Sequence, residues 1–484
     1  MSGTETLTKP ASAQKTEHFD VLIVGAGISG VGAAYHLQEQ CPEKTFVALE
    51  ALDSFGGTWH MHRYPGIRSD SDLYTFGYRF KPWTGTPIAT AEEILTYMKE
   101  VIEENDLDRH IRYNHRISTA KWSSKDNLWT VYATDKKTGE ERRFTANFLW
   151  MCQGYYRHSE GYTPEWPDMD KFKGKKVIVI GSGATAATLV PAIAGDCEHV
   201  TLLQRSPTYF IPGRNENELA DRLRVLGVDE AWIHEITRRE ILHNQAEFTR
   251  RSFEEPEEVR KELLDAVRLF LPEETVQKHF TPSYRPWRQR IAFVPDGDIF
   301  KGIASGKATV ETDEIERFTE KGILLKSGKE LEADIIITAT GFNLSVLGDI
   351  DFDIDGKPLN FADTVTYRGM MFTGVPNMIW IFGYFRASWT LRVDLLGDFV
   401  CRLLKHMDKK GAKKVTVALR KEDSNMPLLP WIDPENFNPG YLMRSMDLLP
   451  KRGDKPEWQH TQDYWVEKDQ LPAIDLDGAE FHYE

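Results

Sequence analysis

The stretch Phe19-Asp20-Val21-Leu22-Ile23-Val24-Gly25-Ala26-Gly27-Ile28-Ser29-Gly30 decides the fold of this chain. Its apolar first half predicts a buried strand, and an apolar helical segment follows the three spaced glycines. Strand, glycine turn and helix in this order form the dinucleotide-binding fingerprint, whose backbone approaches a pyrophosphate at the helix N-terminus. We therefore predict a Rossmann-like fold that holds a dinucleotide through Gly25, Gly27, Ser29 and Gly30.

The end of the next predicted strand indicates the kind of dinucleotide. Glu50 follows the apolar run 45–49 and lies about twenty residues after Gly30, where the fingerprint has its acidic residue. A carboxylate at this position accepts hydrogen bonds from a ribose. It therefore favours an adenosine without a 2′-phosphate.

The same pattern occurs a second time further along the chain. The apolar run 176–180 leads into residues that we expect to hold a second dinucleotide, namely Gly181, Ser182, Gly183, Ala184, Thr185 and Ala186. The strand predicted at 199–203 is followed by Arg205 and Ser206 in place of an acid. Because a guanidinium and a hydroxyl pair well with a 2′-phosphate, this half is predicted to prefer NADPH.

Composition is typical of a large soluble enzyme. The chain has 484 residues and a hydrophobic fraction of 41%, enough for about three domains with their own cores. A net charge of −14 argues against nucleic acid as a partner, and no run approaches the roughly 20 apolar residues of a membrane span. The first 17 residues resemble neither a signal peptide nor a transit peptide.

The four cysteines restrict the class of flavoprotein and the compartment. They are Cys41, Cys152, Cys197 and Cys401, too far apart in sequence for the redox pair of a disulfide reductase. We expect buried structural thiols in a cytoplasmic protein. The His60-x-His62 pair has metal-like spacing, but no further ligand cluster accompanies it, so no metal is expected.

Periodicity along the chain predicts an α/β fold with two Rossmann-like domains, each a parallel sheet interrupted by an antiparallel meander. The first meander is predicted at 116–122, 129–134 and 142–150, and the second at 310–313 and 322–325. A charged helical pattern at 217–277 predicts an insertion that caps the site, or alternatively a solvated decoration. The predicted boundaries are a disordered tail at 1–17, a first domain at 18–155 and 334–484, a linker at 156–175, a second domain at 176–214 and 286–333, and a helical insertion at 215–285.

Residues after Glu50 resemble a known family. The segments Gly56-Gly57-Thr58-Trp59, Tyr64-Pro65-Gly66 and Asp70 fill the signature G-x-W-x-x-x-x-[YF]-P-G-x-x-x-D of Baeyer–Villiger monooxygenases, which insert oxygen beside a ketone carbonyl or oxidise sulfur. Later stretches, including Gly383-Tyr384-Phe385-Arg386-Ala387-Ser388-Trp389-Thr390, most resemble the ethionamide-activating subgroup. The resemblance covers nearly the whole chain after residue 18. It implies FAD in the first fold, NADPH in the second, dioxygen, and a small ketone or sulfur-containing substrate.

The resemblance also implies site residues. It places the catalytic arginine at Arg290, with Arg288 as the competing candidate, and gives Asp70 the role of orienting it and touching both cofactors. In the family this arginine stabilises a flavin peroxide, a task suited to a permanent cation. Three further positions are implied as cofactor contacts, although the aromatic ones are equally compatible with a core role: Thr58, Trp59 and Trp389. Tyr64, inside the same motif, has the same ambiguity.

One family motif is broken. Between the two fingerprints the family carries F-x-G-x-x-x-H-x-x-x-W-P, and Phe172-Lys173-Gly174 begins it, but Ile178 occupies the histidine position. A deletion joining two similar Gly-Lys stretches would produce this pattern. We expect a shortened connection that restricts domain rotation, so that FAD and NADPH still bind while oxygen insertion is weakened or uncoupled to hydrogen peroxide.

Three functions are compatible with the sequence. The favoured one is a Baeyer–Villiger-type monooxygenase; the second is a flavin monooxygenase restricted to nitrogen or sulfur nucleophiles, or an NADPH oxidase. The third is a dinucleotide-binding protein without turnover, which leaves Arg290 and Asp70 without a purpose. Ketone and sulfide assays separate the first two, and the sequence leaves the oligomeric state open.

Overall fold

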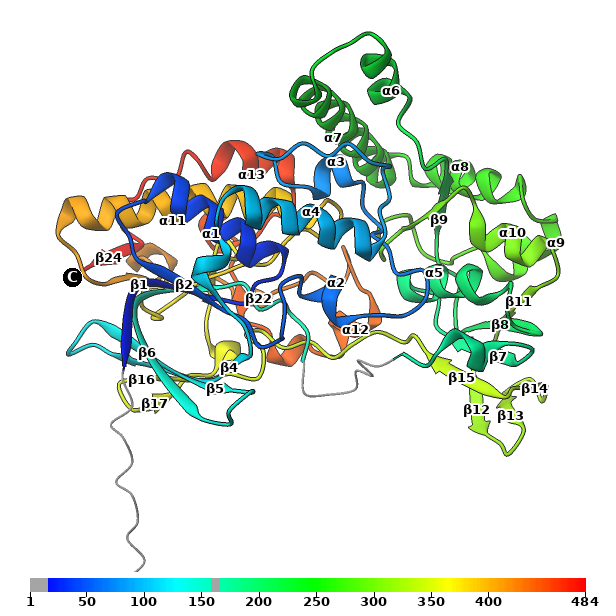
Figure 1. The fold of residues 1–484 in the computed structure, drawn as a ribbon, viewed down its shortest axis with the longest axis horizontal. Coiled ribbons are helices and arrows are strands. Elements are labelled where there is room, and N and C mark those ends of the chain that lie inside the picture. Colours follow the sequence, from blue (N-terminus) through cyan, green and yellow to red (C-terminus); the bar gives the residue numbers. More distant parts are fainter. Residues whose placement is uncertain (1–15, 158–165) are drawn as a thin grey trace, which may run out of the picture.

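The computed structural model describes residues 16–157 and 166–484 and contains two α/β domains side by side. The first domain is built on a nine-stranded sheet and the second on a four-stranded sheet. Figure 1 shows the first domain on the left, the second on the right, and one helical hairpin projecting above them. The two-domain α/β fold expected from the sequence is confirmed.

The nine-stranded sheet combines a parallel part and an antiparallel part. Its order is β17-β16-β4-β5-β6-β1-β2-β3, and β20 also pairs with β6. The long strand β6 joins the two parts, because its first half is antiparallel to β5 while its second half is parallel to β1. The strands are β1 (Glu17–Val24), β2 (Phe46–Leu49), β3 (Ile111–Arg112), β4 (His115–Ser123), β5 (Leu128–Asp135), β6 (Glu141–Met151), β16 (Asp351–Ile354), β17 (Lys357–Pro358) and β20 (Met378–Trp380).

Both faces of this sheet are covered, which explains the continuous apolar runs of its parallel strands. In β1, Val21 and Ile23 contribute to the core on one face, and Leu22 and Val24 to the core on the other. On one face, α1 packs against α11. The helices of this domain are α1 (Ile28–Gln40), α2 (Thr58–Met61), α3 (Leu73–Phe76), α4 (Ala91–Glu104), α11 (Trp389–Lys410), α12 (Gly440–Met443) and α13 (Tyr464–Gln470).

The second domain has a parallel sheet of order β11-β8-β7-β15. Its strands are β7 (Lys176–Ile180), β8 (His199–Gln204), β11 (Ala308–Thr312) and β15 (Ile335–Thr338), and α5 (Ala184–Ile193) and α10 (Asp298–Ala304) belong to the same domain. Beside the sheet lie a parallel pair, β9 (Phe210–Gly213) with β10 (Ala292–Pro295), and an antiparallel meander of β12 (Ile315–Phe318), β13 (Gly322–Leu325) and β14 (Glu330–Glu332). Three pairs of short strands complete the described fold: β18 (Thr366–Tyr367) with β19 (Met371–Phe372), β21 (Val415–Val417) with β24 (Phe481–Tyr483), and β22 (Leu429–Pro430) with β23 (Lys451–Arg452).

Two strand assignments from the sequence are wrong. The segment 310–313 was expected in the second meander, but β11 runs parallel to β8. The boundary at 334 placed the next strand in the first domain, whereas β15 pairs in parallel with β7, Ile335 opposite Val177. Both errors have one cause, because a short apolar run does not reveal which partner it pairs with or in which direction.

The structure also corrects the predicted boundaries of the N-terminal tail and of the linker. Glu17 already belongs to β1 and pairs with Arg112, so the expected tail cannot extend to residue 17. Phe172 is buried in the core of the second domain and stacks on Trp166 at 5.8 Å, so the chain from residue 166 belongs to that domain rather than to a linker. Residues 1–15 of the expected tail and 158–165 of the expected linker lie outside the described residues.

The helical insertion connects the two domains. It comprises α6 (Glu218–Val225), α7 (Glu230–Glu254), α8 (Pro256–Arg268) and α9 (Glu273–His279). Helix α7 lies against α3 of the first domain, where the buried Arg238 donates to the carbonyls of Tyr74, Thr75 and Gly77. Helices α8 and α9 instead contact β9 and β11 of the second domain. The α6–α7 hairpin is the projection in Figure 1.

All four cysteines are buried and unpaired, as expected for structural thiols. Within the described residues, no helix has the length and apolar character needed to cross a membrane.

Acid is expected to weaken the contact between α7 and the first domain at His234. Burial, followed by the nearby Arg238, lowers the pKa of His234 to about 4, while its Nδ1 accepts a hydrogen bond from the Trp83 N–H at 3.2 Å. The unfolded chain takes up this proton near pH 6.5, so stability is complete above pH 6.5 and is lost as the pH falls towards 4.

The expected loss is about 2 kcal/mol between pH 7 and pH 5. A His234→Gln variant keeps an acceptor but does not titrate, so its free energy of unfolding in urea should fall by about 2 kcal/mol less over this range. Equal losses for the two proteins would contradict the assignment.

Candidate active site between the two nucleotide-binding folds

A cavity of about 850 Å³ lies between the two domains and is lined by both glycine fingerprints. Fourteen of the predicted catalytic and cofactor-binding residues line it, together with Tyr64, namely Gly25, Gly27, Ser29, Glu50, Thr58, Trp59, Asp70, Ser182, Gly183, Ala184, Thr185, Arg205, Arg290 and Trp389. Four others lie beside it without lining it, namely Gly30, Gly181, Ala186 and Ser206. One continuous space therefore connects the two predicted nucleotide sites.

The first fingerprint has the shape of a pyrophosphate cradle. Gly25 has φ +98°, and a Cβ on Gly30 would lie only 1.9 Å from the Gly25 carbonyl oxygen, so both positions require glycine. Gly27, the residue before helix α1, provides no side-chain cap, which leaves the first N–H groups of the helix for a ligand. Glu50 fixes the loop, because its two carboxylate oxygens accept from the N–H groups of Ala26 at 2.7 Å and Leu52 at 2.8 Å.

The second fingerprint repeats these features. Gly181 has φ +126°, and a Cβ there would lie 2.3 Å from the Ala339 carbonyl oxygen, so this glycine serves the close approach of β7 and β15. A Cβ on Gly183 would meet nothing within 4 Å, and α5 begins there without a side-chain cap. The open space faces the cavity, and Arg205 lines the same end. Both fingerprints thus fit dinucleotides, as the sequence predicts.

The segment from Tyr64 to Asp70 forms the seam between the two domains. Its even-numbered residues contact the second domain: Tyr64 bonds to the Thr185 side chain, Gly66 lies against α5, Arg68 pairs with Asp298 at 2.6 Å, and Asp70 pairs with Arg290. Two residues between them, Ile67 and Ser69, bond to the first domain, through Ser69 N–H to the Ala89 carbonyl and Ala91 N–H to the Ile67 carbonyl. We call residues 64–70 the seam segment.

Gly66 explains why the signature needs glycine in this segment. It has φ +72°, and a Cβ would lie 2.7 Å from the Cβ of Ala192 on α5. Any larger residue would push the second domain away. The Tyr-Pro-Gly part of the signature is therefore a contact between domains as well as a lining of the cavity.

Asp70 and Arg290 form a bidentate ion pair inside the cavity. Arg290 Nε donates to Oδ2 at 2.6 Å and Nη2 donates to Oδ1 at 2.8 Å, while Nη1 reaches the Phe385 carbonyl at 3.4 Å. Burial opposes the charge on Arg290, but Asp70 outweighs this effect and raises the pKa of the guanidinium. Arg290 is therefore a permanent cation held in a fixed orientation.

Arg288, the competing candidate, points elsewhere. Its Nη2 pairs with the exposed Glu435 at 3.1 Å, and it does not line the cavity. The helical insertion also contributes none of the described residues that line the cavity, so the expectation that it caps the site is wrong. The insertion is not a free decoration either, because α7 buries Ile233, His234, Thr237 and Arg238.

Aromatic side chains around Arg290 form a wall of which the sequence analysis singled out only Trp389. Tyr155 stacks on Trp389 at 5.3 Å, its hydroxyl lies 2.8 Å from that of Tyr156, and Tyr441 lines the same cavity. Burial raises the pKa of Tyr155 and of Tyr441, so both remain protonated. Trp389, at the start of α11, donates from Nε1 to the Ser29 hydroxyl at 2.8 Å and thereby connects this wall to the first fingerprint. Nothing in the sequence placed Tyr155 or Tyr441 beside Arg290, because both lie far from it along the chain.

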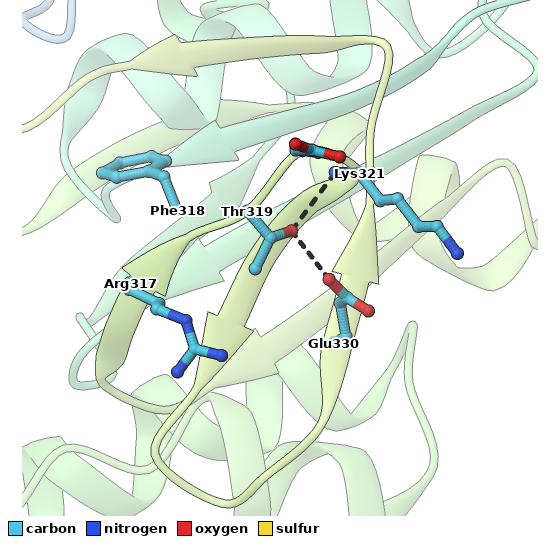
Figure 2. Close-up of a pocket in the computed structure, with 6 residues that line it drawn as sticks. Arg317, Phe318, Thr319, Lys321 and Glu330 are labelled. Atoms are coloured by element: carbon cyan, nitrogen blue, oxygen red, sulfur yellow. Dashed lines mark hydrogen bonds between the residues drawn. The ribbon is translucent and has the colours of Figure 1, made fainter.

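A second hollow, of about 680 Å³, lies on the β12–β14 meander and is far simpler. The Thr319 hydroxyl donates to Glu330 at 2.7 Å and accepts from the backbone N–H of Lys321 at 3.3 Å. Dashed lines mark both bonds in Figure 2. These polar groups satisfy one another, and the hollow is lined only by surface residues of one hairpin region. It has no feature of a catalytic site.

Comparisons with known proteins agree with this geometry. Residues 23–85 match the NAD(P)-binding Rossmann-like domain family. The chain is 45% identical to the FAD-containing monooxygenase EthA of Mycobacterium tuberculosis over 468 residues, covering 93% of this chain and 94% of that protein. It is 43% identical to the probable FAD-binding monooxygenase AlmA of Acinetobacter sp, covering 96% of each. The chain belongs to this family of FAD-containing monooxygenases.

Solved structures share the fold at lower identity. A steroid monooxygenase bound to NADP superposes with a TM-score of 0.75 and 22% identity, covering 96% of this chain and 99% of that one. A cyclohexanone-bound cyclohexanone monooxygenase gives 0.71 and 18%, covering 97% and 100%. The chain therefore shares its overall fold with these two monooxygenases.

The two glycines of the second fingerprint provide a matched test of the cradle. Gly183→Ala should leave folding and FAD content unchanged, because its Cβ meets no protein atom, but should raise the KM for NADPH about tenfold by occupying space beside the pyrophosphate. Gly181→Ala should instead lose soluble protein, because its Cβ collides with backbone. Normal NADPH affinity in a folded Gly183→Ala protein would show that the pyrophosphate lies elsewhere.

Proposed function

We propose that this protein is an NADPH-dependent flavin monooxygenase of the Baeyer–Villiger type, which inserts oxygen next to a ketone carbonyl and also oxidises sulfides or thioamides. The observation that carries the proposal is the bidentate Asp70–Arg290 pair in the cavity that joins the two nucleotide cradles. FAD occupies the first cradle, where Glu50 favours an unphosphorylated ribose, and NADPH occupies the second, beside Arg205.

The residues present fit both cofactors and divide the work between them. Reduced flavin, when bound, supplies the activation of dioxygen. Arg290 offers a permanent positive charge to the negative oxygen that attacks a carbonyl, and Asp70 holds that guanidinium at one angle. The wall of Tyr155, Trp389 and Tyr441 excludes water from this region.

The charge balance favours carbonyl attack over simple transfer to a soft nucleophile. An anionic oxygen nucleophile gains from a nearby cation that cannot lose its proton, and the raised pKa of Arg290 supplies that condition. Tyr155 and Tyr441 keep their protons and add hydrogen-bond donors without negative charge. Oxidation of sulfur or nitrogen depends less on a cation that stabilises an anionic oxygen nucleophile, so it is a secondary activity of the same site.

A second candidate, an uncoupled NADPH oxidase, is favoured by the region between the two fingerprints. The alignment with EthA has 468 positions, which is more than the number of residues in the 93% of this chain that it covers. The alignment therefore includes positions where EthA has a residue and this chain has none. The broken motif at Phe172 to Ile178 is the place where the sequence indicates a deletion. A shorter connection restricts the domain rotation that separates nicotinamide from flavin, and release of hydrogen peroxide would follow.

The Arg290→Met variant distinguishes these functions. It should retain FAD and the reduction of flavin by NADPH, but ester formation from ketones should fall about a hundredfold or more, because the cation that stabilises the attacking oxygen is lost. Ester, sulfoxide and hydrogen peroxide should each be measured per NADPH consumed.

Arg288→Met is the matched control, since that arginine contacts only the exposed Glu435 among ion-pair partners in the described chain. It should keep the parental ratio of product to NADPH. Full ketone oxidation by Arg290→Met would refute the mechanism, and a parent protein that converts every NADPH to peroxide would establish the oxidase instead.

The coenzyme preference should depend on Arg205. Replacing it with alanine removes charge-assisted hydrogen bonds to the 2′-phosphate, so the KM for NADPH should rise about tenfold or more while that for NADH stays within about twofold. Steady-state rates with both coenzymes provide the measurement. An equal rise for NADPH and NADH would place the 2′-phosphate away from this guanidinium.

A further inference from the structure

The backbone just before Arg290 has an unusual conformation. Trp287 has φ +60°, in the left-handed region that bulky residues rarely adopt. Such a conformation persists only where the surroundings fix it, and it recurs at functional sites. Because Trp287 lies three positions before Arg290, its backbone sets the direction in which the following residues run to the cavity.

One side chain holds the Trp287 carbonyl. Arg386 donates to the Trp287 carbonyl from Nη2 at 3.1 Å and from Nε at 3.3 Å. The same Nη2 donates to Asn436, to its carbonyl at 2.9 Å and to its side-chain Oδ1 at 2.8 Å. Arg386 therefore joins the strained turn to the C-terminal segment, which also donates from the Asn438 N–H to the Arg288 carbonyl at 2.9 Å.

Phe385, the residue before Arg386, contacts the guanidinium of Arg290. The Phe385 carbonyl accepts from Arg290 Nη1 at 3.4 Å, and the Phe385 N–H donates to Gln462 Oε1 at 2.7 Å. Residues 385 and 386 thus contact both the guanidinium of Arg290 and the backbone from which it extends. A displacement of residues 385 and 386 would therefore move both the guanidinium of Arg290 and the backbone that precedes it.

The charge of Arg386 is costly to keep in this place. In the described part of the chain neither Arg386 nor its neighbour Arg285 forms an ion pair, yet both lie over the ring of Phe253, at 5.1 and 4.1 Å, and both donate to the Asn436 carbonyl. Burial, and then Arg285, lowers the pKa of Arg386 to about 10. A structural contact alone does not require two unpaired cations side by side.

We propose that Arg386 is a positioning residue that fixes the left-handed turn at Trp287 and thereby aims Arg290 at Asp70 and the cavity. Its simultaneous contacts with Trp287 and Asn436 use the planar fork of a guanidinium, which lysine reproduces only in part. This inference rests on the role of Arg290 in the proposed function, but the geometry it describes is measurable without turnover.

The test is hydrogen–deuterium exchange on the FAD-loaded full chain. In Arg386→Met, amides in peptides covering 285–292 should exchange at least tenfold faster than in the parent, and Arg386→Lys should lie between the two. The matched control is Arg402→Met, because Arg402 also donates to backbone carbonyls, those of Leu471 and Pro472, but on α11 away from the cavity. Its exchange at 285–292 should equal that of the parent.

A second measurement connects the turn to the chemistry. In Arg386→Met the oxygenated product per NADPH should fall at least fivefold, with hydrogen peroxide rising in step, while the FAD content and the rate of flavin reduction stay within twofold. Parental exchange at 285–292 in Arg386→Met, or parental coupling despite faster exchange, would overturn the proposal. If Arg386→Met does not fold, the same two measurements on Arg386→Lys decide. If the parent makes no oxygenated product, the proposed function fails, and the exchange data still decide whether Arg386 fixes the turn.

Discussion

The seam segment, residues 64–70, is the constraint on which the site depends. Its alternating residues bond to one domain and contact the other, and it ends in the Asp70–Arg290 ion pair. A bidentate carboxylate–guanidinium pair resists rotation far better than a single contact, so the orientation of Arg290 is set from the first domain although its backbone belongs to the second. The family signature therefore describes a junction between domains, with the close approach at Gly66 as its steric requirement.

Buried polar contacts hold the first domain's side of this junction. Arg392 on α11 is fully buried and pairs with Glu467 on α13 at 2.8 Å, and Glu467 also accepts from the Tyr384 hydroxyl at 2.6 Å. Because these groups have no access to water, loss of one partner would leave an uncompensated charge. They fix α11, whose first residue Trp389 contacts Ser29, and the loop that carries Phe385 and Arg386. The Arg290 side chain is thus supported through rigid elements on both sides.

The helical insertion shows how one element serves two domains. Its longest helix, α7, is anchored to the first domain by Arg238 and His234, whereas α8 and α9 pack on the second. Any rotation between the domains must therefore bend the chain near the α7–α8 junction at Glu255 as well as the connections between the folds. A shortened segment before β7 would add to this restraint. The broken motif at Ile178 would thereby lower the amount of oxygenated product formed per NADPH consumed.

Features that depend on short-range interactions could be predicted from the amino-acid sequence. Glycine is the only residue that fits at Gly25, Gly30 and Gly181, so the two cradles were visible as patterns, and the acid or arginine after each second strand indicated the ribose chemistry. Tertiary structure decided what depends on contacts between distant segments. It placed β15 and β11 in the parallel sheet, distinguished Arg290 from Arg288, and brought Tyr155, Tyr441 and Arg386 to the same arginine, because pairing partners and side-chain neighbours far apart in sequence leave no periodic signal in the chain.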